Sequence, residues 1–265
     1  MSTLRIAIEG IGLWTPQLGN VDALRAMLAG ADVTPPPARP AAATLPANER
    51  RRAPESVLLA TEVADQAVAM SGRAATELAC VFTSSHGDQA ITDYMCATLA
   101  ATPTELSPTK FHNSVHNAPV GYWTIATGCH AASTAVCAHK LSFGAGLLEA
   151  ASLALADTRP VLLVCSDIAG SGPLREVTGC SQAFGAALVL APVSAAPAMA
   201  TLALRLSPAR GERAAALPEP LATWRASNPA AGALDLLLPL LRGEAHARCA
   251  ASDSMELDLD MEYPD

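Results

Sequence analysis

The segment Ser133–Ala150 reads STAVCAHKLSFGAGLLEA. A short β-branched and apolar run is followed by a break, and then by small and apolar residues at helical spacing. This order predicts a strand, a tight turn and a helix, which is the arrangement that many enzymes use to present a nucleophile. The residue at the turn is His139, followed by Lys140. Any account of function must therefore explain an elbow without a cysteine or serine at its tip.

Composition restricts the classes of protein that need to be considered. The chain has 265 residues, of which 51% are apolar and 4% aromatic, so it is long enough to bury a substantial core. Ala, Leu and Val supply most of the apolar content, which is typical of buried strands covered by Ala-rich helices. The net charge of −8 argues against nucleic acid as a partner.

Cysteine usage and the N-terminus both predict a cytoplasmic protein. The chain has seven cysteines, an odd number, and no CxxC pair. This favours buried reduced thiols over a disulfide framework. The sequence MSTLRIAIEGIG lacks the apolar core of a signal peptide. No apolar run is long enough to span a bilayer, so we expect no membrane span.

Strand and helix patterns alternate along the chain, which predicts an α/β layered fold. Amphipathic or apolar helices are expected at 20–30, 56–72, 88–100 and beyond Pro119. The charged run Glu49–Arg52 is interpreted as a solvated loop. The expected strands are Leu4–Gly10, Leu78–Ser85, Ser133–Cys137, Pro160–Ile168 and Ala183–Pro192.

The C-terminal part contains a strand candidate at Met199–Ser207, a helix at Gly232–Gly243 and the strictly alternating segment MELDLDMEYP from Met255. Alternation places one set of side chains against the core and the other in water. A charged outer face is typical of a strand at the edge of a sheet. The expected inward residues are Met255, Leu257, Leu259 and Met261, and the outward ones are Glu256, Asp258, Asp260 and Glu262.

Short motifs taken singly do not indicate a cofactor or metal. GIG at Gly10–Gly12 is followed by Thr15 where a dinucleotide fingerprint has its third glycine. His112 and His116 have the spacing of a metal pair on a helix, but no third ligand is evident. KLSFG around Ser142 resembles half of a serine-hydrolase elbow, but lysine stands where the first glycine is needed.

Considered together, the motifs resemble those of the β-ketoacyl synthase family. The resemblance covers about residues 4–192. It is carried by IAIEGIGLWTPQLGNVDALRAMLAG (Ile6–Gly30), ACVFTSSHGD (Ala79–Asp88), NAPVGYWTIATG (Asn117–Gly128) and GCSQAFGAALVLAP (Gly179–Pro192).

The family's nucleophile motif Thr-Ala-Cys-Ser-Ser-Ser falls on Cys137–Ser142, so His139 occupies the position of the catalytic cysteine. We expect Cys137, two residues upstream on the strand, to be a buried structural thiol. The family also uses two histidines from its second half. After Pro192 this chain has only His246 and no His-Gly-Thr motif. The resemblance therefore implies that no catalytic residue is present.

What the resemblance implies is a chain length factor in a short form. Such subunits pair with an active β-ketoacyl synthase as a heterodimer and shape the acyl tunnel, while an acyl carrier protein delivers the chain. Short forms are typical of aryl polyene or xanthomonadin-type pigment biosynthesis, which uses fatty-acid-type chemistry. The classical subunits often carry glutamine in place of the cysteine, and His139 departs from that pattern too.

The implied fold is a thiolase-like half-fold, with a mixed five-stranded sheet, helices on both faces and an antiparallel last strand. Residues 1–192 would form the ketosynthase-like domain, and residues 193–265 a strand and helix extension packed on it. The family dimer pairs the strands before the elbow, here AASTAVC. Candidate tunnel and interface residues are Phe111, His112, His116, Tyr122, Trp123, Cys137, Ser142 and Phe143.

Two alternatives remain open from the residues. The chain could be an active acyltransferase or thioester hydrolase that uses Cys137 or His139 as nucleophile. It could also be a docking module for a carrier protein, with no influence on product length.

Overall fold

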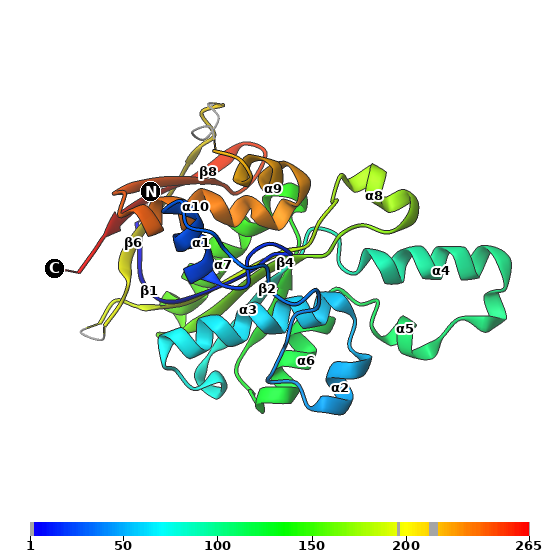
Figure 1. The fold of residues 1–265 in the computed structure, drawn as a ribbon. Coiled ribbons are helices and arrows are strands. Elements are labelled where there is room, and N and C mark those ends of the chain that lie inside the picture. Colours follow the sequence, from blue (N-terminus) through cyan, green and yellow to red (C-terminus); the bar gives the residue numbers. More distant parts are fainter. Residues whose placement is uncertain (1–2, 195–196, 212–216, 265) are drawn as a thin grey trace.

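The computed structural model describes residues 3–194, 197–211 and 217–264, which form one eight-stranded sheet flanked by helices (Figure 1). The strands are β1 (Leu4–Trp14), β2 (Ala79–Thr83), β3 (Ser133–Val136), β4 (Val161–Asp167), β5 (Phe184–Pro192), β6 (Ala200–Pro208), β7 (His246–Ala250) and β8 (Met255–Glu262). The α-helices are α1 (Val21–Leu28), α2 (Ala47–Arg52), α3 (Glu55–Ser71), α4 (Gln89–Ala101), α5 (Pro108–His112), α6 (Ala118–Thr127), α7 (Ser142–Ala156), α8 (Gly172–Thr178), α9 (Leu221–Ser227) and α10 (Leu234–Arg242). Short 3₁₀ segments are η1 (Ala75–Glu77), η2 (Pro103–Glu105), η3 (His139–Leu141) and η4 (Pro229–Ala233).

The sheet is mixed, in the order β3-β2-β4-β5-β1-β6-β8-β7. β2 pairs in parallel with β3 and β4, whereas β5 is antiparallel to both β4 and β1. The α/β class, the mixed sheet and the antiparallel β5 are thus confirmed. The sheet has three strands more than expected, because β1 pairs with β6 along its second edge and β8 and β7 continue from there.

Helices cover both faces of the sheet, as expected. Helices α3 and α6 lie on one face and α7 and α10 on the other, and each pair contributes to its own buried apolar cluster (Figure 1). The glycines of the GIG motif allow α3 to approach β1. A Cβ at Gly12 would lie 1.9 Å from the Val63 carbonyl oxygen, and one at Gly10 would lie 2.1 Å from that of Ala67. The motif therefore serves helix–strand packing.

Residues on both sides of Pro192 belong to the larger apolar cluster. It includes Leu147 of α7 and Leu188 of β5 together with Leu204 of β6, Leu237 of α10 and Leu257 of β8. A shared core is consistent with an extension that packs on the same domain. The division at residue 192 stays a prediction.

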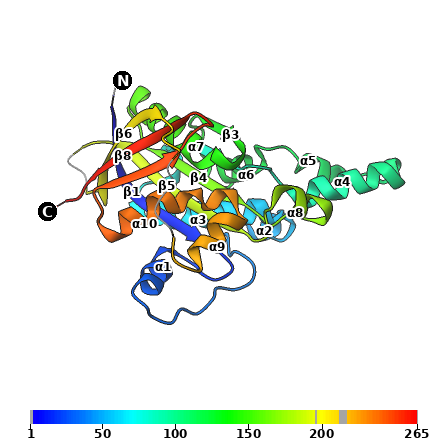
Figure 2. The ribbon, with the colours of Figure 1, turned by 90° about the horizontal axis from the view of Figure 1, so that it is seen from above.

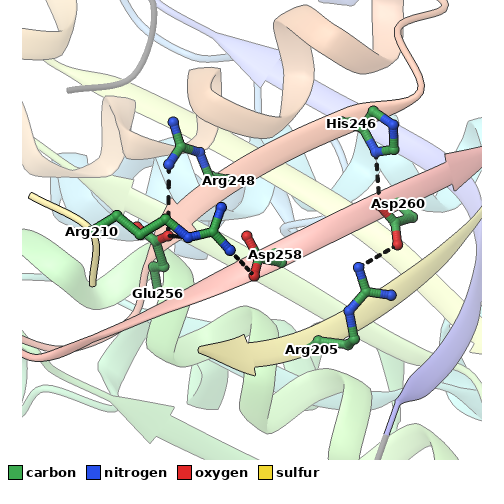
Figure 3. A network of polar contacts seen from close by, with 7 residues as sticks. All are labelled: Arg205, Arg210, His246, Arg248, Glu256, Asp258 and Asp260. Atoms are coloured by element: carbon green, nitrogen blue, oxygen red, sulfur yellow. Dashed lines mark hydrogen bonds and ion pairs between the residues drawn. The ribbon is translucent and has the colours of Figure 1, made fainter. Parts of the chain in front are cut away.

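The C-terminal strand β8 was predicted to lie at an edge, and this is wrong. It lies between β6 and β7, and the edge is β7, which the sequence did not reveal. Of the residues expected to face inward, Leu257, Leu259 and Met261 are buried, whereas Met255 is half-buried. Glu256 was expected to face water, and this is wrong, since it is buried. The acidic side chains form ion pairs on the outer face of the sheet, where Figure 3 shows them between arginines and His246. A strand whose charged side chains are neutralised by ion pairs can lie inside a sheet. The alternation of acidic and apolar residues was therefore not enough to identify an edge strand.

Two further features concern the surface. The run Glu49–Arg52 lies in helix α2, not in a loop, because the preceding Pro46 begins a helical turn. Helices α4 and α5 form an arm that projects from the body (Figures 1 and 2). Leu99 and Phe111 on this arm are 52% and 59% exposed.

Among residues 3–194, 197–211 and 217–264, no helix has both the length and the apolar character needed to cross a bilayer.

Candidate functional site

The predicted elbow is present between β3 and α7. The strand ends at Val136, η3 begins at His139, and α7 begins at Ser142. His139 has a φ of 51°, which only two other non-glycine residues in the described ranges approach, Ala42 and Thr158. A side chain in this left-handed region is uncommon and strained, and such residues cluster at functional sites. His139 thus stands at the strained position of the turn.

Hydroxyl groups hold the backbone of this turn. The His139 carbonyl oxygen accepts hydrogen bonds from Ser85 Oγ and from Ser142 Oγ, each at 2.7 Å. Ser142 Oγ in turn accepts from the Ala138 N–H at 3.0 Å. The Ser142 hydroxyl is thus buried and holds the backbone of the elbow.

The imidazole of His139 is exposed and lies beside a second histidine. Its ring centroid is 5.4 Å from that of His86, with an interplanar angle of 81°. Burial lowers the pKa of His86 below its usual value, and the nearby His139 and Lys140 lower it further. The lowered pKa favours the neutral form of the His86 imidazole.

Cys137 was expected to be a buried thiol, and this is wrong. It is exposed, and its Sγ donates to the Ser85 carbonyl oxygen at 3.3 Å. β3 is a four-residue strand at the sheet edge, so nothing in the described chain covers its end. Cys96 on α4 is also exposed, whereas the other five cysteines are buried and all seven are free.

The remaining candidates do not lie together in one site. His112 and Tyr122 line an apolar pocket of about 400 Å³ between α2 and α6, together with Leu45, Val115 and Ile125. Phe111 lies on the arm, and His116 Nε2 is 2.9 Å from the Ser84 carbonyl oxygen. Trp123 and Phe143 are buried in the two main apolar clusters.

Sequence reasoning missed Leu45, Val115 and Ile125 as pocket residues. Ile125 is 84% exposed, in the last turn of α6. The only sequence signal for this pocket would have been an apolar residue on the exposed face of a helix. That signal can be recognised only once the buried face of the helix is known. No group of three or more His, Cys, Asp or Glu side chains within the described ranges could hold a metal ion.

A known family matches most of the chain. The model for the β-ketoacyl synthase N-terminal domain matches residues 26–254. The chain belongs to this family. A comparison with curated proteins gives no match.

Solved structures of the family show the same fold. A chain of the complex between the ketosynthase ApeO and its chain length factor ApeC from Xenorhabdus doucetiae is 25% identical, with a TM-score of 0.72 over 97% of this chain and 99% of that one. A chain of the AntDE:AntF complex, a type II polyketide ketosynthase with its acyl carrier protein, is 13% identical with a TM-score of 0.72 over 98% and 99%. The ishigamide ketosynthase/chain length factor is 14% identical, with a TM-score of 0.57 over 79% and 65%. The near-complete coverage in the first two comparisons confirms a short ketosynthase-like form.

Proposed function

We propose that the chain is a non-catalytic chain length factor that pairs with an active β-ketoacyl synthase and shapes its acyl tunnel. The observation that carries the proposal is the histidine at the strained tip of an intact elbow. A condensing enzyme needs a thiolate there, since thiolate combines nucleophilicity with good leaving ability. An acyl-imidazole would hydrolyse and lose the chain.

The second half of the catalytic set is also missing from the described chain. His246 is the only histidine after Pro192. It lies on β7, at the opposite edge of the sheet from β3, and its Nδ1 contacts Asp260 Oδ1 at 2.7 Å. A side chain engaged in that ion-pair network does not supply the general acid that decarboxylation requires.

The edge strand β3 supports pairing with a ketosynthase. Among the described strands it pairs with β2 alone, so its other edge is open there. An open strand edge is a template for pairing with another chain. The neighbouring α6 exposes Ile125 and the arm exposes Leu99 and Phe111, which adds apolar surface of the kind that a partner covers.

The pocket between α2 and α6 supports a role in accommodating an acyl chain. Its lining is mostly apolar, with His112 and Asn117 as polar members, which is the usual character of a small-molecule site. The arginines Arg50, Arg51 and Arg52 form the last turn of α2 beside this pocket. In a chain of net charge −8, such a run favours an acidic partner, and we assign it to the carrier protein that delivers the chain.

By resemblance to the short forms, we place the protein in fatty-acid-type elongation of an aryl polyene or xanthomonadin-type product. The test is reconstitution of the chain with its ketosynthase and carrier protein, followed by measurement of product length. Val115→Trp should fill the pocket and shorten the product. Val177→Trp is the matched control, since Val177 is 81% exposed on α8 and does not line the pocket. Equal products from both variants would contradict the proposal.

One observation favours a second candidate, an acyltransferase or thioester hydrolase. The Cys137 thiol is exposed beside the elbow, so an acyl thioester could reach it. Incubation of the isolated chain with an acyl thioester, followed by intact-mass measurement, separates the two. We expect no retained acyl group; a stable adduct that Cys137→Ser abolishes would establish the second candidate. A complex that forms without altering product length would instead indicate a carrier-protein docking module.

A further inference from the structure

The turn Ser84–Ser85, directly after β2, contacts the elbow through several hydrogen bonds. The Ser84 N–H donates to the Val136 carbonyl oxygen at 3.4 Å, and Cys137 Sγ donates to the Ser85 carbonyl oxygen at 3.3 Å. Ser85 Oγ donates to the His139 carbonyl oxygen at 2.7 Å. This turn is therefore the contact through which the rest of the sheet reaches the strained residue.

Behind the turn lies Asp167, the last residue of β4, which is 2% exposed. Because β2 and β4 are parallel neighbours, their carboxyl ends lie side by side. Asp167 Oδ1 accepts from Ser84 Oγ at 2.6 Å and from the Ser85 N–H at 2.9 Å. The backbone of Asp167 is held in turn, since Asn228 Nδ2 donates to its carbonyl oxygen at 2.8 Å.

We propose that Asp167 is a positioning residue that, through Ser84 and Ser85, holds His139 in its left-handed conformation. A strained non-glycine residue persists only where surrounding contacts over-determine it. Of the two hydroxyls on the His139 carbonyl, that of Ser142 belongs to the adjoining helix, whereas that of Ser85 is anchored from β4. A similar arrangement occurs at Ala42, another left-handed residue, whose N–H donates to Glu62 Oε2 at 2.8 Å.

The distribution of lysines offers a selective measurement. The chain has only two lysines, Lys110 on the arm and Lys140 directly after His139. A lysine-specific protease therefore has two sites, one at the elbow and one as an internal reference. When local opening is fast relative to cleavage, the cleavage rate follows the population of the open form. The ratio of cleavage at Lys140 to cleavage at Lys110 thus reports how firmly the elbow is held, with or without a partner subunit.

The experiment uses the isolated full chain at pH 7.5. Asp167→Ala should raise the ratio at least tenfold, because a buried charged acceptor of two hydrogen bonds is lost, and Ser85→Ala should raise it about fivefold. Asp167→Asn keeps an acceptor oxygen and should stay within twofold of the wild type. Ser152→Ala is the matched control, since Ser152 Oγ bonds only within α7, to the Leu148 carbonyl oxygen at 2.7 Å.

Either of two results would overturn the proposal. One is an unchanged ratio in Ser85→Ala, which removes a single hydroxyl and keeps the fold testable should Asp167→Ala fail to fold. The other is an equal rise of cleavage at both lysines, which would show a general loss of stability with no specific hold on the elbow. A rise confined to Lys140 that Asp167→Asn does not reproduce supports it.

Discussion

The two ends of the sheet hold their carboxylates in different ways. At the end formed by β2, β3 and β4, Asp167 is buried, and its Oδ2 has no hydrogen-bond partner among the described residues. At the end formed by β6, β8 and β7, Glu256, Asp258 and Asp260 each contact arginine, as Figure 3 shows. The first end also has a strained residue, His139.

The two ends therefore differ in how far contacts within the chain satisfy their charged and strained groups. Over the outer face of β8, arginines of the same chain neutralise the acidic side chains, although Glu256 Oε1 has no hydrogen-bond partner among the described residues. The end with the elbow keeps a strained residue, His139, and a buried carboxylate, Asp167, whose Oδ2 has no hydrogen-bond partner among the described residues. Such features are typical of sites that act on or bind something else. We therefore expect perturbation of the two ends to have different consequences.

The largest expected effect is on the pH dependence of stability through Asp167. Burial raises the pKa of this carboxyl from 3.8 to about 6, although hydrogen bonds from Ser84 and Ser85 oppose the rise. A raised native pKa means that the native state binds more protons than the unfolded state between these values. Stability from this group is thus full below pH 3.8 and is lost as pH rises to 6.

Asp167→Asn should remove that loss. Above pH 6 the variant should be more stable than the wild type by up to about 3 kcal/mol, since each pKa unit corresponds to about 1.4 kcal/mol. Urea unfolding between pH 4 and pH 8 measures it. If the unfolding free energy of the wild type instead rose relative to that of Asp167→Asn over this pH range, the raised pKa of Asp167 would be contradicted.

Next in size is the effect of a charge on each sheet edge. Ala135→Lys on β3 should weaken association with the ketosynthase at least tenfold, because a lysine on an edge strand opposes pairing with another chain. Ala250→Lys on the opposite edge strand β7 should leave that affinity within twofold. Sedimentation or native mass spectrometry of the co-expressed pair measures both. Similar losses in the two variants would show that the edges do not differ as we propose.

A smaller effect is expected within the ion-pair network. Glu256 is 11% exposed at its side chain and lies 3.6 Å from Arg210 and 3.7 Å from Arg248. Glu256→Gln should cost about 1 kcal/mol of unfolding free energy, because two arginines lose a partly buried partner. Glu262→Gln is the control, since its pair with Arg5 is exposed on both sides and should contribute almost nothing. Thermal unfolding of the two variants compares them.

The smallest effect concerns Asp260, whose pKa shifts in the direction opposite to that of Asp167. A hydrogen bond with His246, followed by contacts with Arg205, lowers the pKa of this carboxyl below 3.8. Its stabilising contribution is therefore present above pH 3.8 and is lost as pH falls through the lowered value. His246→Ala should move the carboxyl titration, followed by NMR, back toward 3.8. A titration that stays in place would exclude His246 as the main cause.

Much of the fold follows from sequence because its signals are local. Strand and helix alternation, the glycine-bounded turns and the break before α7 each depend on neighbouring residues, so the α/β class and the elbow were predictable. The identity of the residue at the elbow tip was also readable from the family motif. These features need no knowledge of what packs against them.

Tertiary structure alone decided the rest, because it depends on which faces meet. β8 alternates like an edge strand, yet β7 pairs with it and arginines neutralise its acidic face. Cys137 was assigned to the interior from its residue type, but the shortness of β3 leaves it exposed. Asp167 and His139 are 28 positions apart in the sequence, and they are connected through Ser85, in the turn that follows β2. Local sequence patterns are sufficient to predict an elbow that carries histidine. How that histidine is held depends on the packing of β2, β3 and β4, which brings distant residues into contact.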